Sequence, residues 1–591
     1  MKFLGNIDTS NKSLLSTIYH DRDDALDIVL KDNDSNKKYL YTVVKPKMEI
    51  YIVKPEFRDY QHNKIYIETD KCDKYLLQYK NMPFDIPKIL GGEYLDLLDE
   101  FKRTRDFSLL KTFNKSPYLF GTDYDIENWY RVQWRLEYEN MKQKRLTRAF
   151  LDIEVDGIDF EGVPTRGVCP INAVTLIDQE TNVSYTLLLE NDKNPLIEEF
   201  KNNLDDFDRE LHESFDKVYG SDIEYRISFF EDERDLIKTL CKLINTINRD
   251  FLMIWNIAYD LPYIIERCRV LGMEPEEVIS HPDFQIKEAW FREDNFNKTI
   301  ASKSHKYKIS TYTVWLDQMW MYAGLRKSQS EIASYSLNYV ANLELGDNKV
   351  DYSDEADIKT LPYVNYRKFV KYNIKDVLLQ KGLDVRTEDL DNLFSRSYIN
   401  STDYANIFKQ TVFLKHRITE EFLRQDVVPG NNVNIYRNKN TDLLIPMNDD
   451  EDDDGETKFA GAFVADPLLN NPNGIKIMGT NSKFIYKFVV DYDFSSMYPN
   501  IIVSHNMSPH TMYGKVFIDR VIDTKYNQYD IEHKVYDAGK EFIDNYTSED
   551  PIAFGAKWMN LPSTEELANK LKNKHMDKTT LNIFMGDIYN G

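Results

Sequence analysis

The sequence has few cysteines and no long hydrophobic run. Its 591 residues include four scattered cysteines without CxxC spacing: Cys72, Cys169, Cys241 and Cys268. This usage predicts reduced core or surface thiols in a cytoplasmic protein. No run of about 18 apolar residues is present, so we expect no membrane span. The N-terminal segment lacks a sustained apolar stretch, and we therefore expect no signal peptide.

An excess of positive charge is also lacking, since the formal net charge is −23. This argues against an indiscriminate binder of polyanions. A nuclease needs acidic ligands, however, and basic side chains can still line one groove, so charge leaves the function open. The basic stretch 142–148 fits either such a lining or an ordinary solvated face. The acidic run 448–454 is interpreted as a solvated loop.

Hydrophobic residues make up 42% of the chain, which is enough for large cores, and its length predicts several domains. From about residue 145 to 385, strand-like runs alternate with amphipathic helical patterns, which predicts an α/β domain. The apolar stripe from Leu236 to Ile247 shows the helical period and leads into a strand-like run at 251–255. The same patterns predict strands at 39–44 and 49–53 and a mostly helical segment at 386–430.

Two acidic residues alternate with apolar ones in the segment 149–155. Because side chains alternate between the faces of a strand, Asp152 and Glu154 should share the face opposite to Leu151 and Ile153. Residues two apart on a strand are separated by about 6–7 Å. This spacing suits two carboxylates that share a pair of metal ions. Taken alone, the pattern also fits an amphipathic edge strand with a wet face.

Two further segments place acids near helices. Asp260 follows an apolar strand and opens a helical run, where its carboxylate could reach into a cleft or simply cap the helix. Tyr372 and Asp376 are four residues apart on a predicted helix and share one face. A phenol and a carboxylate in this arrangement could orient a water molecule. The alternative is a partly buried tyrosine beside a surface aspartate.

The order of these segments is specific: Asp-x-Glu on a strand, Asn…Asp-x-Pro-Tyr after a strand, and Tyr-x-x-x-Asp on a helix. It resembles the three exonuclease motifs of family B DNA polymerases, the DEDDy group with an RNase H-like fold, and is similar to T-even-type tailed-phage members. One departure is the spacing after Asn256, where only two residues precede the pair Tyr259 and Asp260 and the family usually has three.

The resemblance implies a two-metal 3′→5′ exonuclease. Asp152, Glu154, Asp260 and Asp376 would bind two Mg²⁺ or Mn²⁺ ions, and Tyr372 would help to orient the attacking water. Oxygen ligands suit these hard ions. Two such ions can activate a water and stabilise the leaving 3′-oxygen.

A second resemblance lies in the segment 489–502, which contains Asp-x-x-Ser-x-Tyr-Pro and is similar to motif A of the same family. A strand followed by a proline-terminated turn is the alternative. The resemblance implies that Asp493 binds the catalytic metals and that Tyr498 excludes the ribose 2′-hydroxyl. Successive backbone amides after Asp493 could hold a triphosphate. The predicted nucleotide-binding residues are Phe494, Ser495, Ser496, Met497, Tyr498, Lys574 and Lys578, although the two lysines also fit a solvated helix face.

The later polymerase motifs of the family, a Lys-x-x-x-Asn-Ser-x-Tyr-Gly helix and an Asp-Thr-Asp turn, are not found. Because phosphoryl transfer needs carboxylates from both palm motifs, we expect polymerisation only with a second polypeptide that supplies the remaining palm, fingers and thumb. A natural split subunit and a truncated sequence both fit this pattern. The other expected partners are primer–template DNA, dNTPs and a sliding clamp, in the cytoplasm of an infected bacterial host.

The predicted fold is a multidomain α/β and α+β protein with an RNase H-like exonuclease domain followed by an incomplete polymerase palm and fingers. The predicted domains are a β-rich N-terminal domain (1–120), the exonuclease domain (121–385), a helical linker and acidic loop (386–458), a partial palm (459–560) and half of the fingers (561–591). Two alternatives stay open: a free-standing 3′→5′ DNA exonuclease, and a non-catalytic DNA-binding or assembly subunit.

Overall fold

The structure is a computed structural model, and its described residues lie mostly before position 431. They are 4, 9, 11–58, 66–104, 116, 118–122, 124–138, 146–162, 164–191, 193–220, 222–294, 299–327, 332–352 and 357–430, with short segments beyond. The chain divides into two compact units, Met1–Pro446 and Met447–Gly591, and each is described by itself.

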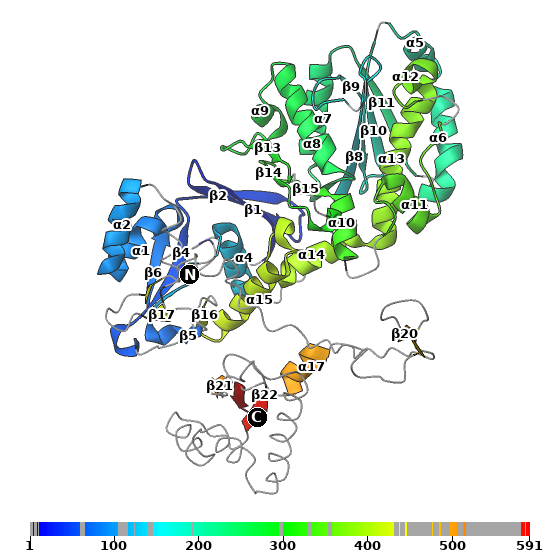
Figure 1. The fold of residues 1–591 in the computed structure, drawn as a ribbon. Helices are drawn as coiled ribbons and strands as arrows, with labels where there is room; N and C mark the ends of the chain where they lie inside the picture. The colour runs from blue at the N-terminus through cyan, green and yellow to red at the C-terminus, as the bar shows by residue number, and fades with distance from the viewer. Residues whose placement is uncertain are drawn as a thin grey trace. The chain divides into compact units, whose positions relative to one another are not determined.

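The N-terminal part of the first unit contains two small antiparallel sheets (Figure 1). Their strand orders are β1-β2-β3 and β6-β4-β7. The strands are β1 (Lys12–His20), β2 (Ala25–Asp32), β3 (Lys38–Val44), β4 (Lys47–Val53), β6 (Cys72–Gln78) and β7 (Leu119–Phe120). The predicted strands at 39–44 and 49–53 are therefore confirmed, as β3 and β4.

Helix α4 (Ile126–Glu137) packs on these sheets, since its Trp129 and Trp134 share a buried core with Ile28 and Ile50 of the strands. Helices α1 (Met82–Leu90) and α2 (Glu93–Thr104) belong to the same part of the chain. A short sheet pairs β5 (Tyr66–Glu68) with β16 (Val427–Pro429), so the end of the described chain before residue 431 returns to the N-terminal part.

A six-stranded mixed sheet forms the centre of the first unit, with the order β11-β10-β9-β8-β12-β15. Its strands are β8 (Arg148–Val155), β9 (Ile171–Asp178), β10 (Val183–Leu189), β11 (Glu224–Phe230), β12 (Phe251–Ile254) and β15 (Val314–Asp317). Strand β8 pairs antiparallel with β9 and parallel with β12. Helices cover both faces of this sheet (Figure 1), which confirms the predicted α/β arrangement.

The two faces of β8 contribute to different cores. Leu151 and Ile153 belong to a buried cluster with α7 (Glu233–Ile247) and α8 (Ile257–Val270). Phe150 belongs to a second cluster that includes residues of α13 (Tyr366–Thr387). Because side chains alternate along a strand, Asp152 and Glu154 lie on the α13 face. The predicted helical stripe at 236–247 is α7, and its apolar residues are buried against the sheet.

The remaining helices of the first unit connect and flank these elements. They are α5 (Leu196–Lys201), α6 (Leu204–Tyr219), α9 (Pro275–Ile279), α10 (Gln318–Leu325), α11 (Leu337–Leu345), α12 (Leu361–Val364), α14 (Asp389–Ile399) and α15 (Gln410–Arg424). A two-stranded sheet pairs β13 (Ala289–Arg292) with β14 (Lys306–Ile309). The predicted helical segment at 386–430 is confirmed by α14 and α15. No helix in the described part of the chain combines the length and apolar character that a membrane crossing needs.

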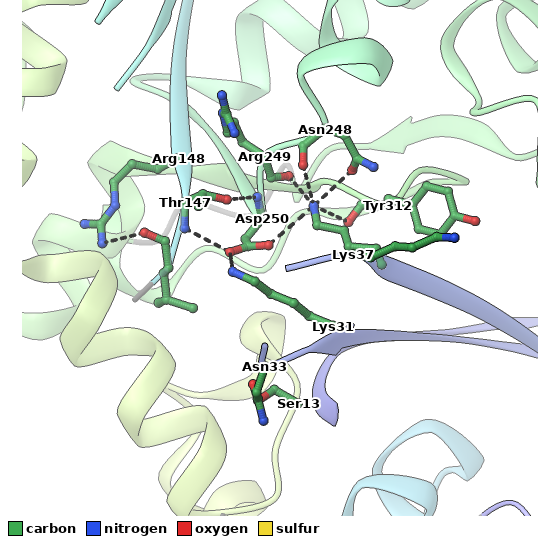
Figure 2. Close-up of polar contacts among 12 residues, drawn as sticks. Ser13, Lys31, Asn33, Lys37, Thr147, Arg148, Asn248, Arg249, Asp250 and Tyr312 are labelled. Carbon is green, nitrogen blue, oxygen red and sulfur yellow. Dashed lines mark hydrogen bonds and ion pairs between the residues drawn. The ribbon is translucent and has the colours of Figure 1, made fainter. Parts of the chain in front are cut away.

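A buried ionic cluster joins the N-terminal strands to the central sheet (Figure 2). Lys31 at the end of β2 donates to Asp250 Oδ2 at 2.6 Å, and the Thr147 amide donates to the same oxygen at 2.9 Å. Lys38 Nζ lies 3.5 Å from Asp250 Oδ1. Burial raises the pKa of Asp250, but the charges of Lys38 and Lys31 outweigh it, so the net pKa is lowered. Asp250, just before β12, is thus a buried carboxylate beside two buried lysines.

Beyond residue 430 the structure describes only short elements. They are β17 (Tyr436–Arg437), β18 (Leu444–Ile445), β19 (Ile475–Lys476), β20 (Phe484–Ile485), α17 (Met497–Ser504), β21 (Met512–Lys515), β22 (Leu581–Phe584) and β23 (Asp587–Asn590). The acidic run at 448–454 lies outside the described residues.

Candidate metal centre

Three of the predicted acids converge between β8 and α13. Asp152, Glu154 and Asp376 each offer a carboxylate oxygen, and these oxygens all lie within 4.8 Å of one another. The strand supplies two of the acids on one face and the helix that packs on this face supplies the third. Asp376 is 1% exposed, so the alternative of a surface aspartate is wrong.

Asp260 lies near this group but is not one of its three members. It is the fourth residue of α8, and Asn256 occupies the N-cap position, so the interpretation of Asp260 as a simple N-cap is wrong. Its side chain is buried, and a hydrogen bond from the Ile153 amide favours its charged form. Burial and the charge of Asp152 outweigh this bond and raise the pKa of Asp260 well above its ordinary value.

The carboxylates oppose one another's ionisation. Burial and the charge of Asp376 raise the pKa of Asp152 to about 7. Burial and the charges of Asp152 and Asp376 raise the pKa of Glu154 well above its ordinary value. Because like charges in a poorly solvated site disfavour ionisation, this cluster needs added positive charge to hold all its acids as carboxylates.

One lysine supplies part of that charge. Lys349 Nζ donates to Asp376 Oδ2 at 2.6 Å and to the Tyr372 hydroxyl at 2.9 Å. Burial disfavours its ammonium group, but Asp376 and its neighbours outweigh this and raise the pKa of Lys349. The sequence reasoning missed this residue, because no motif spacing marks a lysine in the loop that follows α11.

The loop that carries Lys349 makes a second contact with α13, through Asp347 and Lys375. Gly346 ends α11 in the left-handed conformation, with φ of 66°, which glycine adopts without strain. Asp347 then lies 2.5 Å from Lys375 Nζ and accepts a hydrogen bond from Tyr219 at 2.6 Å. Asp347 and Lys349 therefore pair with the adjacent helix residues Lys375 and Asp376.

Tyr372 lies one helical turn before Asp376 and is buried. Burial and the charge of Asp376 raise its pKa, so its phenol keeps its proton at neutral pH. The ring of Tyr352 packs edge-on against it with centroids 5.5 Å apart. Tyr372 is thus a fixed phenol at the edge of the carboxylate group.

The donor set fits hard divalent cations. The group is made of carboxylate oxygens, which Mg²⁺ and Mn²⁺ prefer. Among the residues that the structure describes, no hydrogen-bond partner reaches Asp376 Oδ1, although this atom is buried. A buried acceptor without a donor is costly, and a cation would satisfy it.

Most of the predicted polymerase residues lie outside the part of the chain that the structure describes. Asp493, Phe494, Ser495, Ser496, Lys574 and Lys578 lie outside the described residues. Met497 is the first residue of α17, and Tyr498 on the same helix is 63% exposed. The structure therefore leaves the proposed nucleotide site as a prediction.

Two family models match the chain. The first, DNA polymerase family B, exonuclease domain, matches residues 118–340, which include Asp152, Glu154 and Asp260. The second, DNA polymerase family B, matches residues 431–549, which include Asp493 and Tyr498. The segment with Tyr372 and Asp376 lies outside both matches. This chain belongs to the family B DNA polymerases.

The chain is also similar to curated polymerases at low identity. It is 24% identical to the DNA-directed DNA polymerase of Escherichia phage RB69 over 64% of this chain and 37% of that protein. The corresponding enzyme of Enterobacteria phage T4 is 23% identical over 62% of this chain and 36% of that protein. The DNA polymerase delta catalytic subunit of Plasmodium falciparum is 22% identical over 82% of this chain and 39% of that protein. The chain thus matches well under two thirds of each relative's length.

Proposed function

We propose that residues 121–385 form a 3′→5′ proofreading exonuclease domain with an RNase H-like fold that hydrolyses the terminal phosphodiester of DNA with two divalent metal ions. The observation that carries this proposal is the convergence of Asp152, Glu154 and Asp376 within 4.8 Å, with Asp260 beside them. The match of residues 118–340 to the exonuclease domain of family B DNA polymerases supports it.

The four acids would hold the ions, as carboxylate ligands from β8, α8 and α13. When bound, Mg²⁺ or Mn²⁺ activates a water and stabilises the negative charge on the leaving 3′-oxygen. Because Tyr372 stays protonated, its phenol can hydrogen-bond and orient a water on the Asp376 side of the site. Lys349, which already contacts both residues, places a positive charge where an anionic phosphate would enter.

The second matched segment belongs to the polymerase function of the family. Because residues 431–549 match the family model and contain the motif around Asp493 and Tyr498, we infer that this segment contributes to a nucleotide-adding site. Asp493 would bind metal and Tyr498 would select deoxyribose there. Primer–template DNA and dNTPs are the corresponding substrates. The second polypeptide, the sliding clamp and the cytoplasmic location in an infected host stay predictions.

A gel assay on a 5′-labelled primer–template with Mg²⁺ and all four dNTPs tests the proposal. We expect a ladder of shortened primers with the wild-type chain and none with Asp152→Ala. Loss of one metal-binding carboxylate should reduce the rate by at least about a thousandfold, because the whole catalytic apparatus depends on the ions.

Each outcome of this assay separates one hypothesis from the others. Lengthened primers would show that the chain polymerises alone and would contradict the expectation of a second polypeptide. Primers that stay intact in Mg²⁺ and in Mn²⁺ would contradict the exonuclease and favour a non-catalytic subunit. Shortening that persists in Asp152→Ala would place the nuclease elsewhere.

A further inference from the structure

A buried hydrogen-bond chain ends on one of the proposed metal ligands. We propose that Asn373 is a positioning residue, and that Thr175 and Asn373 together orient the carboxylate of Asp152 for metal binding. The inference rests on the proposed function, because it assigns a role to residues behind that site.

The chain crosses three elements of the α/β region. Thr186 on β10 lies 3.0 Å from Thr175 on β9, measured between the hydroxyl oxygens. Thr175 donates to Asn373 Oδ1 on α13 at 2.6 Å. Asn373 Nδ2 donates to Asp152 Oδ2 at 3.0 Å. Thr186, Thr175 and Asn373 are at most 1% exposed, so water does not compete for these bonds.

The direction of every proton in this chain is determined. A hydroxyl has one proton, and Thr175 uses its proton on Asn373. Thr186 must therefore be the donor to Thr175. Because Thr175 donates to the amide oxygen of Asn373, the amide nitrogen faces Asp152. A reversed amide would place its oxygen against the Asp152 carboxylate oxygen, a contact between two acceptors that disfavours this orientation.

This arrangement gives Asp152 a fixed donor on one of its oxygens. The bond favours a charged carboxylate and limits rotation about the Cβ–Cγ bond of Asp152, so the other oxygen points consistently away from Asn373. Groups that hold metal ligands in this way commonly change metal affinity or activity by about 10–100-fold when they are removed. Asn373 follows Tyr372 directly, so the proposed positioning residue lies within one helical turn of Tyr372 and Asp376.

The helix has a separate anchor to the strand that carries Asp152. Gln380 Nε2 donates to the Leu151 carbonyl at 3.2 Å, and Gln318 Nε2 donates to the Gln380 carbonyl at 2.9 Å. Removal of the Thr175 hydroxyl should therefore leave α13 in place. The expected effect is on the orientation of Asp152 and not on the packing of the helix.

The test is the affinity of the full chain for Mn²⁺, measured by isothermal titration calorimetry. Thr175→Val keeps the side-chain volume but removes the donor to Asn373, and we expect about tenfold or more weaker binding. Thr175→Ser restores the hydroxyl and should bind like the wild type. Thr186→Val is the matched control, since Thr175 can still donate to Asn373, and we expect less than about threefold weakening.

Activity gives a second readout. The Mn²⁺ concentration for half-maximal primer shortening should rise in Thr175→Val by the same factor as the dissociation constant, with an unchanged KM for DNA. Asn373→Ala removes the donor to Asp152 directly and should weaken Mn²⁺ binding even if Thr175→Val does not fold. Melting curves without metal would show whether each variant is folded.

Failure of the inference differs from failure of the proposed function. Wild-type Mn²⁺ affinity in Thr175→Val or Asn373→Ala would overturn the positioning role, provided that the wild-type chain binds Mn²⁺ through Asp152. Equal weakening in Thr175→Val and Thr175→Ser would also overturn it, because the shared change would then be packing. A wild-type chain that binds no Mn²⁺, or binds it equally in Asp152→Ala, would contradict the exonuclease itself.

Discussion

Two groups that contain acids lie on the same six-stranded sheet region and have opposite electrostatics. Asp250 has two lysine partners, and its pKa is lowered. Asp152 has acidic neighbours, and its pKa is raised to about 7. Asp250 directly precedes β12 and Asp152 lies on β8, so both residues belong to the same sheet region. The difference is whether the surrounding protein balances the charge.

The charge balance differs between the Asp250 cluster and the proposed metal site at Asp152. The Asp250 cluster joins the N-terminal strands to the sheet with its charges paired. The Asp152 cluster contains more acids than its one close cation, Lys349, can balance within the described part of the chain. Perturbed carboxylates with like-charged neighbours are typical of functional sites. The missing positive charge is what a divalent cation would supply.

The largest effect on stability is expected for Asp250→Asn. The substitution leaves the buried Lys31 ammonium without its counter-charge and removes the carboxylate that faces Lys38, and breaking such a buried pair costs roughly 3–5 kcal/mol. Urea unfolding followed by tryptophan fluorescence would measure it. Asp99→Asn is the control, because its side chain is 76% exposed and should change stability by less than about 0.5 kcal/mol. Similar stability of both variants would contradict the structural role of Asp250.

The next largest effect on stability is expected for His20, which is paired with two acids, and this effect depends on pH. His20 lies 3.0 Å from Asp27 and 3.0 Å from Glu288, which joins the N-terminal part to the segment before β13. Burial opposes its charge, but the bonds to Asp27 and Glu288 outweigh this and raise its pKa to about 9. Since the folded pKa exceeds the unfolded one, the stabilisation is complete below about pH 6.5 and is lost as pH rises through 9.

A shift of this size corresponds to about 3 kcal/mol. We expect the stability difference between the wild-type chain and His20→Gln to be largest at pH 6 and to shrink by about this amount towards pH 10. Urea unfolding across this range would check it. A difference that stays constant from pH 6 to pH 10 would show that the imidazolium is not the stabilising form.

The carboxylate cluster should respond to the same type of substitution with the opposite sign. Asp152→Asn removes a negative charge from among like charges, so without metal we expect a gain in stability on the order of 2 kcal/mol at pH 8. Urea unfolding in EDTA would measure it beside Asp250→Asn. A loss of stability in this variant would mean that the acids of the cluster are not in mutual repulsion.

The smallest effect is expected at the loop that carries Lys349. Asp347→Asn weakens the pair with Lys375 but keeps a side chain of the same size, so Lys349 should remain near Asp376 with more freedom. We expect primer shortening to slow by about three- to tenfold, which corresponds to roughly 1 kcal/mol in the transition state. Lys349→Met should slow it further. Equal rates in Asp347→Asn and the wild type would show that the pair of Asp347 with Lys375 does not contribute to the rate of primer shortening.

Features that depend on neighbouring residues in the chain could be predicted from the sequence. The alternation along 149–155 predicted a shared face for Asp152 and Glu154 because strand geometry fixes the side-chain direction, and the structure has β8 with this alternation of burial. Helix α7 was predicted from its apolar period in the same way. The order of three short motifs predicted the family, which the family models confirm.

Long-range packing could not be predicted in the same way. Strand β12 pairs with β8 across about a hundred residues of sequence, and no local pattern encodes this pairing. The burial of Asp376 depends on how α13 lies on the sheet. Lys349, Asn373 and the pairing of Asp250 with two N-terminal lysines all result from contacts between distant segments, so sequence reasoning missed them.

The most direct test of the central claim is a count of Mn²⁺ ions bound by the wild-type chain and by Asp152→Ala, by equilibrium dialysis with electron paramagnetic resonance detection. Our account predicts that the wild-type chain binds about two more ions than the variant, because Asp152 belongs to a site that holds a pair. Equal numbers of bound ions in the two proteins would contradict the assignment of this carboxylate cluster as the metal centre.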